Sequence, residues 1–108
     1  MPDLTNREID AKVAENVMGW TAILWRPGRP IGVDPLGVAR VVPRYTEIWE
    51  CMKLVVAKMA ALGWEAFFFC HTDGTASCIF DKSLDECESA DADTLPRAVS
   101  LAALETTK

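Results

Sequence analysis

Four arginines lie close together in the first half of this 108-residue chain, although the whole chain has a formal net charge of −5. They are Arg26, Arg29, Arg40 and Arg44, and the glycines between them allow close backbone approach. Asp34 is the only acidic residue in this stretch. Guanidinium groups, free backbone amides and a helix N-terminus are the groups that bind phosphate. The segment therefore predicts a site for an anionic ligand such as a nucleotide.

Aromatic residues flank the arginine segment, because Trp25 precedes it and Tyr45 follows it. Their rings could stack on a nucleotide base. Thr46 is the predicted N-cap of the next helix. The candidate ligand-binding set is therefore Trp25, Arg26, Arg29, Arg40, Arg44, Tyr45 and Thr46. The alternative is a solvated loop whose arginines pair with the acidic segment 81–93.

No residue pattern indicates an enzyme or a metal site. His71, beside Asp73, is the only histidine, and a histidine in a turn is more often a surface residue than a base. The sequence contains no nucleophile elbow, HExxH motif, P-loop or Rossmann glycine pattern. The four cysteines are not spaced as CxxC, and in a reducing cytosol they remain thiols: Cys51, Cys70, Cys78 and Cys87. We expect no catalytic residue, no metal and no cofactor.

Composition favours one ordered domain over residues 1–108, because half of the residues are hydrophobic. The acidic balance argues against a nucleic-acid or anionic-membrane partner. The sequence has neither a signal peptide pattern nor a long apolar stretch, which predicts a protein of the bacterial cytosol.

The first half of the chain should contain two helices, one strand and a short edge strand. A capping box at Thr5 and Glu8 begins a helix over about 6–18. Residues 20–26 form a predicted strand, and 27–43 are too rich in proline and glycine for regular structure, apart from a short edge strand at 38–42. A helix with a wide apolar face then runs from Thr46 to Gly63.

The second half should contain a hairpin and a last helix. Residues 64–70 are apolar on both faces, which predicts a central strand with Phe67 and Phe69 buried on one face and Phe68 on the other. Asp73-Gly74 is a hairpin turn signal before a strand at 75–80. The acidic segment 81–93 favours a solvated linker, and the alternative is a mimic of phosphate groups.

The last helix, capped by Thr94 or Asp93, is apolar on two sides. This pattern indicates either a deep position or a contact between subunits, and we expect a homodimer. The predicted fold class is α+β, a single-domain α-β-α sandwich with a small, mainly antiparallel sheet.

Three motifs of this sequence resemble the phage ABA sandwich domain family. They are Glu8-Ile9-Asp10 followed by Val17-Met18-Gly19-Trp20, then Tyr45-Thr46-Glu47-Ile48 with Trp49-Glu50, and finally Thr94-Leu95-Pro96-Arg97-Ala98 with Ala102-Ala103-Leu104. The resemblance covers about two thirds of the chain, and its specificity rests on the order and spacing of these motifs. Two departures are Thr46, where the family often has serine, and the 26–44 insertion, which is longer than the family norm. The resemblance implies an α-β-α sandwich and a phage or prophage origin, and it brings no catalytic residues.

Phage origin without catalytic groups favours a non-enzymatic accessory protein that binds and blocks a host factor, for example a component of anti-phage defence. The alternative is a small-molecule binder that sequesters an anionic nucleotide through the arginine segment. A third hypothesis is a structural or replication accessory of the phage with no host target.

Overall fold

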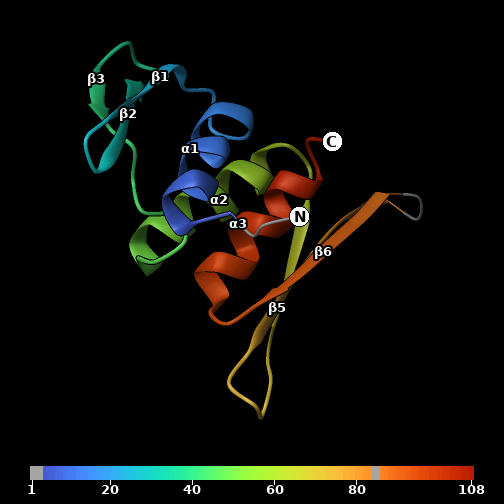
Figure 1. Cartoon of the computed structure of the whole chain (residues 1–108). Coiled ribbons are helices and arrows are strands. Elements are labelled where there is room, and N and C mark those ends of the chain that lie inside the picture. The colour runs from blue at the N-terminus through green and yellow to red at the C-terminus, as the bar shows by residue number, and fades with distance from the viewer. Residues whose placement is uncertain (1–3, 84–85) are drawn as a thin grey trace.

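Three helices form the middle of the molecule and separate two small antiparallel sheets, as Figure 1 shows. The computed structural model describes residues 4–83 and 86–108. The helices are α1 (Asn6–Asn16), α2 (Trp49–Ala61) and α3 (Leu95–Glu105). Sheet A contains β1 (Thr21–Arg26), β2 (Arg29–Val33) and β3 (Ala39–Val41), and sheet B contains β4 (Glu65–Cys70), β5 (Ala76–Ser83) and β6 (Glu86–Ala92). The predicted α+β class is confirmed.

Helix α1 begins with the predicted capping box. The Thr5 hydroxyl accepts a hydrogen bond from the Glu8 N–H at 3.2 Å, and the Glu8 carboxylate accepts one from the Thr5 N–H at 3.1 Å. The helix buries Ile9 and Val13 completely. Gly19, at a φ of +82°, turns the chain into β1.

Strand β1 lies where a strand was predicted, whereas β2 lies in the stretch 27–43 that was predicted to be mostly irregular, so that prediction is wrong for β2. Pro27 and Gly28 form the turn between β1 and β2, and β2 then pairs with both of its neighbours. Gly32 suits this central strand because a Cβ there would lie 3.3 Å from the Trp20 ring and 2.5 Å from the end of Ile23. The short edge strand β3 is confirmed.

Helix α2 begins later than predicted and buries a narrower face. Its N-cap is Ile48, which makes no side-chain capping bond, and not Thr46. Met52, Val55 and Met59 are buried, whereas about half of Trp49 is exposed. The helix therefore contacts the core along one stripe only.

Sheet B corrects two predictions. Strand β4 is at the edge of the sheet and β5 is at its centre, so Phe67, Phe68 and Phe69 remain 44%, 43% and 48% exposed. The predicted central strand with both faces covered is therefore wrong. The predicted solvated linker at 81–93 is also wrong for most of its length, because β5 continues to Ser83 and the chain then returns as β6.

Helix α3 lies deep in the molecule, which explains its two apolar sides within a single chain. It packs against α1, α2, β5 and β6. Thr94, and not Asp93, is its N-cap, because the Thr94 hydroxyl accepts a hydrogen bond from the Arg97 N–H. Within residues 4–83 and 86–108, no helix is both long and apolar enough to cross a membrane.

Candidate functional site

The structure does not bring the four arginines of the predicted anion site together. Arg26 and Arg29 are partners across the β1–β2 hairpin, and both side chains are exposed. Arg40 belongs to β3, where its Nε lies 2.8 Å from a carboxylate oxygen of Asp34 and its guanidinium lies 5.3 Å from the centre of the Trp20 ring. Arg44 forms an ion pair of 2.9 Å with Glu47. The two ion-paired arginines thus have acidic partners close in sequence, and neither partner is in the 81–93 segment.

The amides predicted to receive the anion are already used. The Thr46 N–H donates to Asp10 Oδ1 at 2.9 Å, and the Glu47 N–H donates to the Arg44 carbonyl at 3.1 Å. Tyr45 is buried, and burial raises the pKa of its hydroxyl. An anion at this turn would have to displace Asp10, so the geometry expected for a phosphate site is missing here.

The carboxylate of Asp10 accepts the hydrogen bond that the predicted anion would have received from Thr46. Asp10 has no exposed surface, and its second carboxylate oxygen lies 2.7 Å from Arg7 Nη1. Arg7 also donates to the Val42 carbonyl at 2.8 Å. Burial raises the pKa of the Asp10 carboxyl, although the hydrogen bonds from Thr46 and Arg7 oppose this shift. This network fixes the segment between β3 and α2 to α1.

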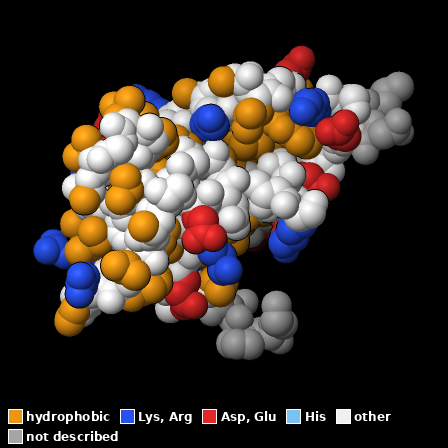
Figure 2. Space-filling model, turned by 90° about the horizontal axis from the view of Figure 1, so that it is seen from above, with side chains coloured by type: hydrophobic (Ala, Val, Ile, Leu, Met, Phe, Trp, Pro, Cys, Tyr) orange, Lys and Arg blue, Asp and Glu red, His pale blue; other side chains and the backbone are white. Residues whose placement is uncertain are grey.

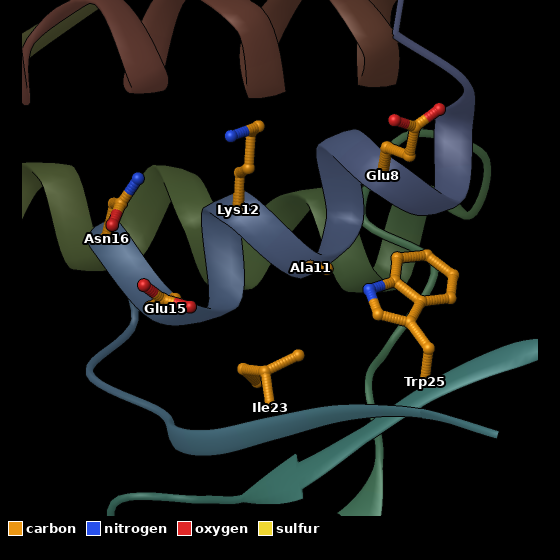
Figure 3. Close-up of a pocket in the computed structure, with 7 residues that line it drawn as sticks. All are labelled: Glu8, Ala11, Lys12, Glu15, Asn16, Ile23 and Trp25. Atoms are coloured by element: carbon orange, nitrogen blue, oxygen red, sulfur yellow. The ribbon is translucent and has the colours of Figure 1, made fainter.

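Trp25 lies apart from the other candidate residues, in the wall of a pocket between α1 and β1. Figure 3 shows Trp25 and Ile23 pointing from the strand toward the helix, near Ala11. The pocket has a volume of about 340 Å³. Its polar lining comes from α1, as Glu8, Lys12, Glu15 and Asn16. Because this lining mixes both signs of charge, it does not select an anionic ligand.

The opposite side of sheet A is an apolar surface with arginines at one end. The register pairs Leu24 with Ile31, Ile31 with Val41, and Arg26 with Arg29, so these side chains share one face. We call this set the outer face of sheet A: Leu24, Arg26, Arg29, Ile31, Val33, Ala39 and Val41. Leu24 is 57% exposed and Val41 is 40% exposed.

This outer face is the most distinctive candidate site that the structure adds. Figure 2 shows hydrophobic side chains gathered over the end of the molecule that sheet A forms, with basic side chains at the margin. The adjoining loop exposes Leu36 and Val38 as well. Apolar surface with a charged rim is typical of a protein-binding site. The available signal in the sequence was that neighbouring residues of a strand point to opposite faces. Leu24 and Ile31 therefore lie on the face opposite to Trp25 and Gly32.

A second polar cluster, which the sequence analysis missed, lies on sheet B. His71 Nε2 is 2.6 Å from Ser77 Oγ, and the Ser77 hydroxyl donates its single proton to Asp91. In a hydrolytic triad the carboxylate holds the histidine, whereas here it contacts the serine itself. The hairpin turn at Asp73 was the available signal, because it places Phe69 and Ser77 at equal distances from the turn and His71 next to them on the same face.

The thiols offer no obvious metal site. Cys78 is buried, and burial raises the pKa of its thiol to about 12. All four cysteines are unpaired. Among residues 4–83 and 86–108, no group of three or more His, Cys, Asp or Glu side chains is placed to hold a metal ion.

Comparison with known proteins relates this fold to a phage protein. No protein-family model matches the chain, and no curated protein matches it either. Its structure is similar to the crystal structure of a phage protein from Bacillus cereus ATCC 14579, with a TM-score of 0.78 and 15% sequence identity. The match covers 98% of this chain and 90% of the Bacillus protein. At this identity, the likeness shows a shared fold.

Proposed function

We propose that this chain is a phage accessory protein that binds a host protein in the bacterial cytoplasm and blocks it without catalysis. The observation that carries the proposal is the outer face of sheet A, where Leu24, Ile31 and Val41 form an apolar strip on a small sheet. The fold of the Bacillus cereus phage protein supports a phage origin. A component of anti-phage defence is the kind of target that such a protein would block.

The arginines suggest the chemistry of the partner. Arg26 and Arg29 stand at one end of the apolar strip, exposed, in a protein of net charge −5. An acidic patch on the partner would complement these two arginines. The rest of this protein is acidic overall and would repel an acidic partner that approached elsewhere. We therefore expect the partner to contact the outer face of sheet A with an apolar centre and an acidic margin.

A pair of matched variants tests the proposal. Leu24→Asp introduces a charge on the outer face, and Leu54→Asp introduces one on α2, where the leucine is similarly exposed. A host protein captured by the wild type should be retained by Leu54→Asp and lost with Leu24→Asp. Because a buried unpaired charge costs several kcal/mol, we expect at least about a hundredfold loss of affinity in calorimetry with the purified partner. Equal binding by both variants would contradict the proposal.

Two alternatives predict different outcomes with the same proteins. Sequestration of an anionic nucleotide requires heat of binding with mono-, di- or cyclic nucleotides, and loss of that heat in Arg40→Ala/Arg44→Ala. A structural or replication accessory instead requires capture of a phage protein from infected cells and none from uninfected cells.

A further inference from the structure

The free edge of sheet B lacks the features that normally protect an edge strand. In the described part of the chain, β4 pairs only with β5. Its last four residues are exposed, and none of them is charged. At the opposite edge, β6 carries Glu86, Glu88 and Asp91, and such charges discourage further strand pairing. The contrast points to β4 as the edge that receives another strand.

The hairpin fixes which backbone groups of β4 face outward. The His71 N–H donates to the Thr75 carbonyl at 2.9 Å, so these two residues form a hydrogen-bonded pair next to the turn. Hydrogen-bonded and non-hydrogen-bonded pairs alternate along an antiparallel ladder. Phe67 and Phe69 therefore direct their N–H and C=O groups toward β5, and Phe68 directs its groups toward the free edge.

We propose that two copies of this chain associate through β4, which pairs antiparallel with β4 of the second copy about a two-fold axis at Phe68. The two three-stranded sheets then become one continuous sheet. In this register the N–H of each Phe68 donates to the carbonyl of the other Phe68. The backbone N–H and C=O groups of Ala66 and Cys70 also point to the free edge. Ala66 of each copy lies opposite Cys70 of the other copy, so these groups extend the hydrogen-bonded ladder on both sides of Phe68.

The side chains are self-complementary in this register. Phe67 lies opposite Phe69 of the second copy on one face of the sheet. Phe68 lies opposite Phe68 of the second copy on the other face. Cross-strand aromatic pairs of this kind stabilise antiparallel sheets. Glu65 lies opposite His71 of the second copy, so the only acidic group of β4 meets the only histidine of the chain.

A second copy fits this edge better than an unrelated strand does. One sequence supplies both halves of every pair, and no like charges face each other from position 65 to position 71. A closed two-fold pair also removes both exposed β4 edges at once, so the two edges of the joined sheet are the acidic β6 strands. Addition of a strand from a different protein is the outcome that the experiment must separate from this one.

Mass and affinity measurements provide the first test. Analytical ultracentrifugation of the wild type should give twice the 11.9 kDa mass of one chain. Phe68→Lys places two ammonium groups next to the axis and should weaken the dimer by about tenfold or more. Ser89→Lys, on the exposed edge strand β6, is the matched control and should leave the dimer unchanged.

Amide exchange of the wild type keeps the test independent of how the variants fold. On dilution into the monomer range, exchange at the amides of Ala66, Phe68 and Cys70 should accelerate, while exchange at Phe67 and Phe69 should change little. A monomeric wild type would refute the proposal. A dimer that Phe68→Lys leaves intact, or whose formation does not protect the Phe68 amide, would refute it as well.

Discussion

Replacement of Asp10 by alanine should destabilise the protein by about 2–3 kcal/mol. Asp10 is fully buried and accepts hydrogen bonds from the N–H of Thr46 and from Arg7. Alanine leaves the buried Thr46 N–H without an acceptor, which costs about 1–3 kcal/mol. Arg7 loses its carboxylate but keeps the carbonyl of Val42 as an acceptor, so its contribution is the smaller one.

Asparagine at position 10 should cost less than alanine, because its carbonyl can still accept the Thr46 N–H, although its NH2 group then faces the donor Arg7 Nη1. Burial raises the pKa of Asp10, so the folded state binds this proton more tightly than the unfolded state does. The wild type should therefore lose stability, relative to Asp10→Asn, as the pH rises through the pKa of Asp10 in the folded protein.

Urea denaturation measured by tryptophan fluorescence tests both statements. Glu15→Ala, at an exposed position on the same helix, is the control and should change the free energy of unfolding by less than about 0.5 kcal/mol. If Asp10→Ala unfolds at the same urea concentration as this control, the buried network does not hold the segment before α2. If Asp10→Ala and Asp10→Asn lose the same free energy of unfolding, the negative charge of Asp10 stabilises the fold and its hydrogen bond with the Thr46 N–H does not.

Three further changes test other parts of the fold. Gly32→Ala should destabilise by about 1–3 kcal/mol, because its methyl group would press on Ile23 and Trp20; an unchanged urea midpoint would contradict the packing of sheet A. Thr94→Ala removes the N-cap of α3 and should cost about 1 kcal/mol in the same assay, whereas Thr94→Ser should cost little. The N–H groups of Val38 and Leu36 lower the pKa of Asp34, so its contribution to stability is present above its ordinary value of 3.8 and disappears as the pH falls through its folded-state pKa; acid titration of Asp34→Asn should lack this component.

The elements that could be predicted from the sequence are those with local signals. Thr5 and Glu8 satisfy each other's amides whatever the rest of the chain does, and the structure contains this capping box. Asp73-Gly74 likewise specifies its hairpin, because Gly74 adopts a φ of +92° that favours glycine. These signals place α1, α3 and the β4–β5 hairpin close to their observed positions.

The position of β4 could not be predicted, because it depends on contacts that are distant in sequence. Three successive phenylalanines favour a strand with two covered faces when burial within one chain is assumed. The structure instead places β5 at the centre, where Ala76, Cys78 and Phe80 face the helices. The apolar residues of β4 therefore lie in an edge strand. The pattern of apolar residues along a strand predicts which faces of the sheet are covered, but it does not predict whether the strand lies at the centre or at the edge.

The arginines of segment 26–44 do not converge, for a related reason. Proximity in sequence suggested convergence, but β2 and β3 spread the arginines over a sheet that alternates between two faces. Arg40 points to the side of Trp20, whereas Arg26 and Arg29 share the face of Leu24. The acidic partner of Arg40 is Asp34, which the sequence analysis noted as the only acidic residue of the segment and did not assign to any arginine.

The two proposed surfaces lie on opposite sides of the helices, because sheet A and sheet B are separated by them in Figure 1. Association through β4 therefore leaves the outer face of sheet A free in both copies, and the dimer presents two such faces. If the host partner is itself an oligomer, the second contact becomes intramolecular and can raise the apparent affinity by about 10²–10⁴ without any new interaction. Under the proposed function, a protein with one modest apolar strip would gain tight binding by this route, and Phe68→Lys would then weaken host binding although it lies far from the strip. The same variant should leave the binding of a single, monomeric partner domain unchanged.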